Sequence, residues 1–233
     1  MTRNLHQRLA AIINATESGG RLPSEPRLAQ QLCVSRATLR EAMRTFETQG
    51  LLRRRQGVGT FVIHPSQVID GGLEILESIE TKAERIGLLV SMGELSVVNC
   101  SVGDVAAEQL QVDVDERIVC VSRIILADDR PVAFLVDKLP EKFLSADEVN
   151  GGFTGSVLDL LLRRGAPLLG SSRCEIKAIA ADVVVARALD IQRGDAVQCF
   201  ESLLFSVEGE PIDYSLSYFL PGYFKFHVIR RVG

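Results

Sequence analysis

Residues 22–62 read LPSEPRLAQQLCVSRATLREAMRTFETQGLLRRRQGVGTFV, and this stretch decides the fold of the first part of the chain. Ser24 and Ser35 each precede apolar residues of helical period, where serine side chains cap helices. Two short apolar strands follow, separated by a glycine-containing turn at residues 56–59. Together with an amphipathic helix expected over residues 5–15, this order of three helices and a hairpin predicts a winged helix-turn-helix.

The arginines of this stretch point to DNA binding. In a winged helix-turn-helix the third helix enters the major groove, and its N-terminal residues face the base edges. Arg36, Thr38 and Arg40 are predicted on its exposed side, and the guanidinium fork of arginine can donate two hydrogen bonds to one guanine. A solvated helical face is the alternative. The residues expected to contact DNA are Ser35, Arg36, Thr38, Arg40, Arg55, Gly57 and Gly59.

Charge is divided unevenly along the chain. The 233 residues carry a net charge of −4, which taken alone argues against a nucleic-acid partner. Residues 1–64, however, hold ten arginines against four acids, and residues 65–233 hold 16 basic and 26 acidic residues. A head of +6 on a body of −10 is typical of a DNA reader joined to a separate module.

Four segments of the first part match a known pattern: LPSE at 22–25, VSRATLREA at 34–42, GLL at 50–52 and RQGVGTFV at 55–62. They resemble the GntR family of bacterial transcription regulators, and the resemblance implies the same DNA contacts. One DNA-touching arginine of that family is replaced by Pro26, and Arg27 is the candidate substitute. Cys33 stands where the family commonly has glycine, so a left-handed backbone is expected there.

The rest of the chain predicts a second, strand-rich unit. A linker is expected over residues 65–72, where a proline, polar residues and a double glycine interrupt the pattern, and a helix is expected over residues 73–86. Two long hairpins follow, turned at residues 128–130 and 208–211, with helices on one side of a mostly antiparallel sheet. The fold class is therefore α+β. The expected boundaries are 1–64 for the DNA-binding domain, 65–72 for the linker and 73–233 for the second domain.

Short motifs between Val121 and Phe226 share the order of one effector-domain family. They are Val121-Ser122-Arg123, Pro131, Leu139-Pro140, Ser156-Val157-Leu158, Glu175, Ala178, Asp195, Gly209-Glu210-Pro211-Ile212-Asp213, Ser217-Tyr218 and Phe226. Together they resemble the UTRA effector domain, which is similar in fold to chorismate lyase. This resemblance implies membership of the HutC subfamily of GntR regulators.

The resemblance also implies a small-molecule effector site. It assigns effector binding to Arg123, Ser156, Arg173, Asp213 and Tyr218. Two further arginines, found in members that hold phosphorylated sugars, are here Ile125 and Leu220. Because a phosphate dianion needs several charge-assisted donors, the expected effector is less charged, of an anionic carboxylate type.

Arg123, Arg173 and Ser156 could instead have purely structural roles. Arg123 could pair across strands with Asp137, and Arg173 with Glu175, as exposed ion pairs that contribute little. Ser156 could be an ordinary helix cap, which is compatible with contacting a ligand.

Composition excludes several other classes of protein. Five cysteines without a C-x-x-C pair are typical of reduced, mostly buried thiols in a cytoplasm. The three histidines lack ligand spacing, so neither a metal nor another cofactor is expected. The chain shows no signal peptide and no apolar run of about 18–20 residues, so a cytoplasmic protein is expected.

The sequence thus predicts a ligand-responsive transcription regulator, a repressor that binds a near-palindromic operator as a homodimer. It predicts no enzyme activity, because no nucleophile–base pair or phosphate loop is visible. Two alternatives remain: an enzyme of the UTRA fold that acts on a small carboxylic acid, and a DNA-binding protein that responds to no effector.

Overall fold

The computed structural model describes residues 2–17, 19–48, 51–55, 57–62, 69–100, 103–151, 153 and 155–230. Several sequence-based predictions lie outside these residues. They are Gly50 of the matched GLL segment, Gln56 in the wing turn and the first part of the linker.

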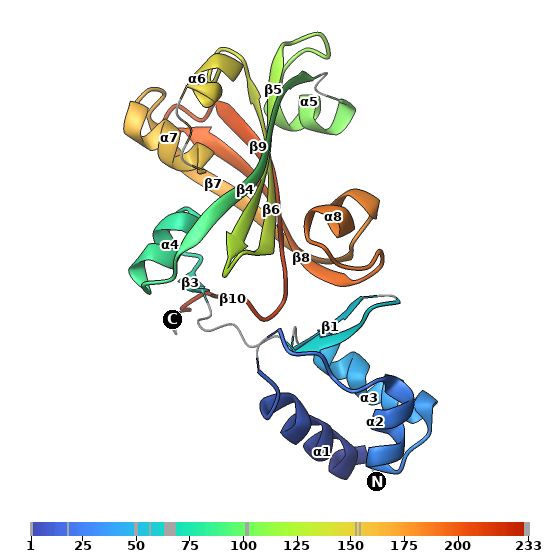
Figure 1. The fold of residues 1–233 in the computed structure, drawn as a ribbon. Helices are drawn as coiled ribbons and strands as arrows, with labels where there is room; N and C mark the ends of the chain where they lie inside the picture. Colours follow the sequence, from blue (N-terminus) through green and yellow to red (C-terminus); the bar gives the residue numbers. More distant parts are fainter. Residues whose placement is uncertain are drawn as a thin grey trace.

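The first unit is the predicted winged helix-turn-helix (Figure 1). Its elements are α1 (Thr2–Asn14), α2 (Glu25–Leu32), α3 (Arg36–Thr48), β1 (Leu52–Arg55) and β2 (Gly59–Val62). One apolar cluster holds them together, with Leu9, Leu28 and Leu39 fully buried. The turn between α2 and α3 contains Cys33 at a φ of 54°, which confirms the predicted left-handed backbone.

The segment between the two units differs from the expectation. Residues 69–72, predicted as linker, form β3 (Ile69–Gly72), which pairs in parallel with β10 (Phe224–His227). The helix predicted over residues 73–86 is only α4 (Ile79–Arg85). Ser78 caps it by accepting a 3.0 Å hydrogen bond from the Thr81 amide, and this cap fixes where the helix begins.

The second unit is built on a six-stranded antiparallel sheet in the order β4-β5-β6-β9-β8-β7. Its strands are β4 (Val90–Cys100), β5 (Ile118–Ala127), β6 (Arg130–Pro140), β7 (Leu169–Ala180), β8 (Ala196–Ser206) and β9 (Pro211–Phe219). The hairpin between β5 and β6 turns at Asp128 and Asp129, both with positive φ, as a tight two-residue turn requires. The predicted α+β class is confirmed.

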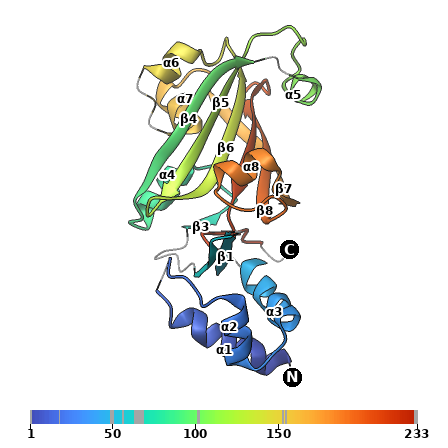
Figure 2. The same ribbon diagram turned by 45° about the vertical axis from the view of Figure 1, so that its right-hand side comes forward.

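Helices cover both faces of this sheet, so the prediction that they gather on one side was wrong. The two faces follow from strand alternation, because successive side chains point to opposite sides. On one face, α6 (Ala146–Asn150) and α7 (Val157–Arg164) pack over Val121 and Ile212. On the other, α5 (Asp104–Leu110) packs over Ile118 and Tyr214, and α8 (Val183–Ala188) lies on the same side (Figures 1 and 2).

The cysteines also depart from the expectation of reduced thiols. Cys100 and Cys120, on the neighbouring strands β4 and β5, form a disulfide with their Cα atoms 6.2 Å apart. Cys33 and Cys174 are exposed free thiols, and Cys199 is buried. None of the helices in the described part of the chain is long and apolar enough to cross a membrane. The described residues also contain no group of three or more His, Cys, Asp and Glu side chains that could hold a metal ion.

Candidate DNA interface and ligand cavity

The start of α3 is shaped by Ser35. Its hydroxyl accepts a 3.1 Å hydrogen bond from the Thr38 amide, so it caps the helix that begins at Arg36. The side chains of Ser35 and Thr38 are also 2.8 Å apart. Both residues are exposed, and Leu39 on the opposite side of the helix is buried. The capped end therefore faces outward, as reading a major groove requires.

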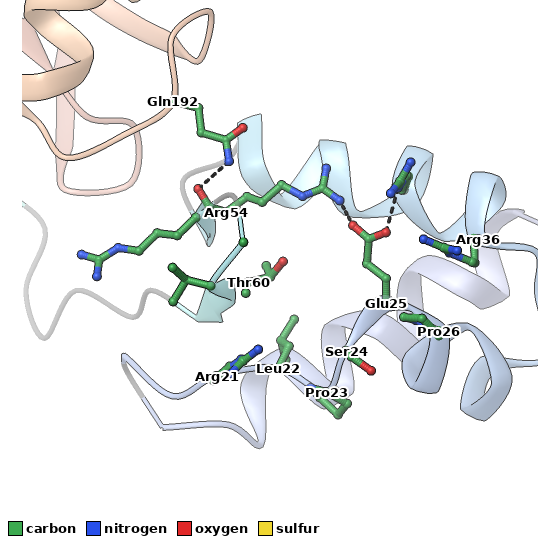
Figure 3. A pocket seen from close by; sticks show the side chains of 15 residues that line it. Arg21, Leu22, Pro23, Ser24, Glu25, Pro26, Arg36, Arg54, Thr60 and Gln192 are labelled. Atoms are coloured by element: carbon green, nitrogen blue, oxygen red, sulfur yellow. Dashed lines mark hydrogen bonds and ion pairs between the residues drawn. The ribbon is translucent and has the colours of Figure 1, made fainter.

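A groove of about 610 Å³ lies between the start of α2, the first turns of α3 and the wing (Figure 3). Five arginines line it, against the single acid Glu25. The predicted DNA contacts that meet there are Arg36, Arg40, Arg55, Gly57 and Gly59. Arg27 is exposed on α2 outside the groove, and Ser35 and Thr38 are not part of its lining.

The unexpected feature of the groove is Glu25, which holds two of its arginines. Arg40 donates from Nε to Glu25 Oε2 at 2.7 Å, and Arg54 pairs with the other carboxylate oxygen. Arg54 was not predicted as a site residue, although the run of three arginines at the base of the wing is visible in the sequence. Among the described residues, Arg36 forms no ion pair. Its guanidinium is thus available to a ligand without breaking an existing contact.

The wing also touches the second unit, through the loop that follows α8. Asp190 pairs with both Arg53, at 2.9 Å, and Arg55. Arg53 donates to the Leu189 carbonyl at 3.0 Å. Gln192 donates to the Arg54 carbonyl at 3.1 Å and lines the groove (Figure 3). Burial lowers the pKa of Arg53, and the nearby Asp190 carboxylate opposes that shift.

A larger cavity, of about 790 Å³, lies in the second unit. It is bounded by α4, the start of α7 and one face of the sheet. Three of the five predicted effector residues line it: Arg123 on β5, Ser156 before α7 and Asp213 on β9. Ser156 is also the cap of α7, since its hydroxyl accepts a 3.0 Å hydrogen bond from the Asp159 amide.

Arg173 and Tyr218 do not line this cavity. From Ser172 onward the lining residues of β7 are Ser172, Cys174 and Ile176, so the alternation of the strand places Arg173 on the opposite face. Before Ser172, where the strand register shifts, three consecutive residues, Leu169, Gly170 and Ser171, line the cavity. There Arg173 donates to Gln109 Oε1 at 2.9 Å, rather than pairing with Glu175.

Tyr218 is out of phase with Asp213 in the same way. It stacks on Phe134 with the ring centroids 5.9 Å apart, and burial raises its pKa to about 12. The structure thus does not bring Arg173 and Tyr218 together with the other predicted effector residues.

Three ionisable side chains, those of Arg123, Asp137 and Asp213, meet beside the cavity. Arg123 pairs with Asp137, as the structural alternative allowed, but both side chains are buried, at 5% and 11% exposure. The buried pair is therefore not the weak surface contact that was considered. Asp213 shares a hydrogen bond with Asp137, and burial raises the pKa of Asp213 well above its usual range. A hydrogen bond between two carboxyl groups requires one proton, and the raised pKa of Asp213 favours that residue as the proton's carrier.

Several cavity residues were missed by the sequence reasoning. They include the polar residues Glu80, Lys82, Ser202, Ser215 and Ser217. The serines could have been found, because Ser215 and Ser217 follow Asp213 at the period of two that defines one face of a strand. Glu80 carried no such signal, because the helix was predicted to begin well before it.

Comparison with protein families agrees with this geometry. Residues 2–62 match the family described as "Bacterial regulatory proteins, gntR family", and residues 90–225 match the UTRA domain. The chain is 27% identical, over 223 residues, to the HTH-type transcriptional repressor NagR of Bacillus subtilis (strain 168), which covers 91% of this chain and 86% of that one. It is 29% identical over 192 residues to the Histidine utilization repressor of Pseudomonas aeruginosa, covering 79% of this chain and 74% of the relative.

Solved structures show the same fold. The crystal structure of PhnF from Mycobacterium smegmatis superposes with a TM-score of 0.63 at 21% identity, covering 98% of this chain and 100% of that chain. The separate effector domain of PhnF superposes with a TM-score of 0.56 at 17% identity, covering 66% of this chain and 95% of that one. At this level of identity the likeness establishes the arrangement of elements.

Proposed function

The chain belongs to the HutC subfamily of the bacterial GntR transcription regulators, whose members join a winged helix-turn-helix to a UTRA domain. We therefore propose that it is an effector-controlled repressor. In this proposal residues 1–64 bind the operator as the DNA-binding domain, residues 65–72 connect the two domains, and residues 73–233 hold a small molecule. Its place of action is the bacterial cytoplasm, where the operator lies.

One observation supports operator binding most strongly: the groove that gathers Arg36, Arg40 and Arg55 beside the capped start of α3. Arginines arranged in this way suit the guanine edges and the phosphates of one major groove. Gly57 has a φ of +74° and open space where a side chain would lie, so the wing backbone can approach the duplex closely. Two named relatives are repressors, which favours the same sign of control here.

A homodimer is part of the proposal. A twofold dimer presents two α3 helices to half-sites about 34–36 Å apart, and therefore prefers a near-palindromic operator. An operator of this kind should be protected symmetrically, on two half-sites one helical turn apart.

Control by the effector is proposed to pass through two connections. Phe226 on β10 lines the cavity, and β10 pairs with β3, which is the last part of the connection at residues 65–72. On the other side, β8 carries the cavity residue Phe200 and begins shortly after the loop that holds the wing. A ligand moves the DNA-binding units only to the extent that it binds their two arrangements with different affinity. The family and the named relatives are transcription regulators, and we propose no reaction for the cavity.

The proposal is tested by purifying the protein and selecting genomic fragments at moderate salt, followed by gel shift and footprinting. Binding to discrete near-palindromic sites, released by a metabolite fraction, is the expected result. Binding that shows no sequence preference refutes the regulator. Specific binding that no metabolite changes supports the effector-independent alternative instead.

A further inference from the structure

The buried polar atoms of the cavity are mostly acceptors without a donor. Within the described part of the chain, both carboxylate oxygens of Glu80, Oδ1 of Asp213 and Nε of Arg123 are buried without a hydrogen-bond partner. All three residues line the cavity, and Arg123 and Asp213 are 5% and 6% exposed. Among the buried polar atoms of these three residues, three acceptor oxygens and one N–H donor are therefore without a partner. Since a buried acceptor without a donor is costly, this imbalance indicates a donor-rich ligand.

The cations of the cavity, in contrast, already have partners. One of the two terminal nitrogens of Arg123 is paired with Asp137. The Lys82 ammonium donates to the Gly72 carbonyl at 3.3 Å and lies 5.9 Å from the centre of the Phe226 ring. Two more acids line the cavity: Glu77, which is paired with Arg85, and Glu74, which adds a further negative charge. The electrostatics of the cavity therefore favour a positively charged ligand over a negatively charged one.

The shape around Glu80 is also that of a binding position. A Cβ at Gly155 would lie 3.0 Å from Glu80 Oε1, so the glycine lets the carboxylate lie against the backbone there. Burial raises the pKa of Glu80, and the Arg123 charge opposes that shift. The nearby rings of Phe200, Phe219 and Phe226 lie 4.4–5.1 Å apart and give the cavity an aromatic wall.

From these contacts we infer that the effector is an organic amine: its ammonium group binds Glu80 and donates to Asp213, and its apolar part lies against the Phe200, Phe219 and Phe226 rings. An acceptor atom on the same molecule can take the Nε–H of Arg123. This inference rests on the proposed effector function and names its chemistry. An amine effector replaces the carboxylate effector that the sequence predicted from Ile125 and Leu220. The reason is that the buried groups without partners are mostly carboxylate oxygens, which need a donor.

The test uses the full-length protein and pairs of probes, each pair with one cationic and one anionic member. The pairs are 2-phenylethylamine with 3-phenylpropionate, histamine with imidazolepropionate, and glucosamine with glucose 6-phosphate. Binding is measured by calorimetry and thermal shift at neutral pH. At least one amine is expected to bind, with Glu80→Gln weakening it about tenfold or more, since a charged hydrogen-bond partner is lost. The control Glu84→Gln removes the same charge from an exposed position on the same helix and leaves affinity unchanged.

Folding of each variant is checked by its thermal transition, and Asp213→Ala, which removes the acceptor oxygen, serves as a second variant if Glu80→Gln does not fold. Binding of the anionic members instead of the amines overturns the inference, and so does binding of no amine or an amine affinity that Glu80→Gln leaves intact. Gel shifts on the operator are run in parallel. Release of DNA by an anion would support the proposed regulator and refute the amine effector. Absence of operator binding would count against the regulator itself.

Discussion

Asp190, in the loop after α8, lies with Oδ2 2.9 Å from a guanidinium nitrogen of Arg53 at the base of the wing. The same carboxylate pairs with Arg55, a proposed DNA contact. An acid of the second unit thus occupies an arginine that we propose as a contact of the operator. If Arg55 has this role, the second unit and the DNA compete for it, and the ion pair connects the two units electrostatically.

Replacing Asp190 should therefore strengthen operator binding. Asp190 has a φ of 51°, which asparagine tolerates, so Asp190→Asn removes the charge without straining the backbone. We expect up to about fivefold tighter binding in a gel-shift titration, because an exposed ion pair contributes about 0.2–1 kcal/mol. Glu208→Gln, an exposed change of equal charge away from the wing, is the control. Equal gains from both variants would attribute the effect to net charge alone.

Arg36 and Arg27 separate groove contacts from nearby exposed charge. Arg36→Ala should cost about 1–3 kcal/mol of specific operator binding if its fork contacts a guanine. Arg27→Ala should cost less, because Arg27 lies outside the groove. Quantitative gel shifts on operator and on scrambled DNA measure both. Equal losses for the two variants would show that Arg27 replaces the family arginine after all.

The buried pair of Arg123 and Asp137 makes a prediction about stability. Arg123→Ala leaves Asp137 buried without its counter-charge and should lower the free energy of unfolding by about 3–5 kcal/mol. The double variant Arg123→Ala/Asp137→Ala should lose less than the sum of the two single changes. Urea unfolding of the second unit measures these terms. Where Arg123→Ala still folds, operator binding should persist and the effector response should be lost; strict additivity would argue against the pair.

Asp213 predicts how stability depends on pH. The pKa of Asp213 in the folded protein is higher than its usual value of 3.8 in an unfolded chain. Just above pH 3.8 the unfolded chain has therefore released a proton that the folded protein still holds. Asp213 therefore contributes full stability below that pH, and this contribution is lost as pH rises through the folded-state pKa. Asp213→Asn, which can still donate to Asp137, should flatten the fall of stability with pH. An unchanged pH profile in thermal melts would contradict the raised pKa.

Arg173 and Tyr218 should prove dispensable for the effector. Arg173→Ala and Tyr218→Phe alter the face of the sheet opposite the cavity, so operator release by effector should keep its wild-type concentration dependence. The matched change inside the cavity is Ser217→Ala, on the same strand and in phase with Asp213. Loss of response in Arg173→Ala with a wild-type response in Ser217→Ala would mean that the ligand lies on the other face.

The sequence by itself determined the first unit almost completely. The cap at Ser35, the left-handed turn at Cys33 and the wing at Gly57 and Gly59 depend on neighbours a few residues away, so local chemistry specifies them. The antiparallel hairpins of the second unit were predictable for the same reason, through turn residues such as Asp128. The alternation of side chains along a strand was also predictable. Asp213 and Tyr218 are an odd number of residues apart on one strand, so the sequence alone places Tyr218 on the opposite face.

Tertiary structure alone decided the remainder. Glu80, Arg123 and Asp213 share one cavity although long stretches of chain separate them, and which of their atoms lack partners depends on packing. The hydrogen bond from Arg53 to Leu189 joins residues 136 positions apart. The sequence predicts helix periodicity and helix caps because both depend on residues only a few positions apart. The balance of donors and acceptors in a buried site is set by groups that only folding brings together.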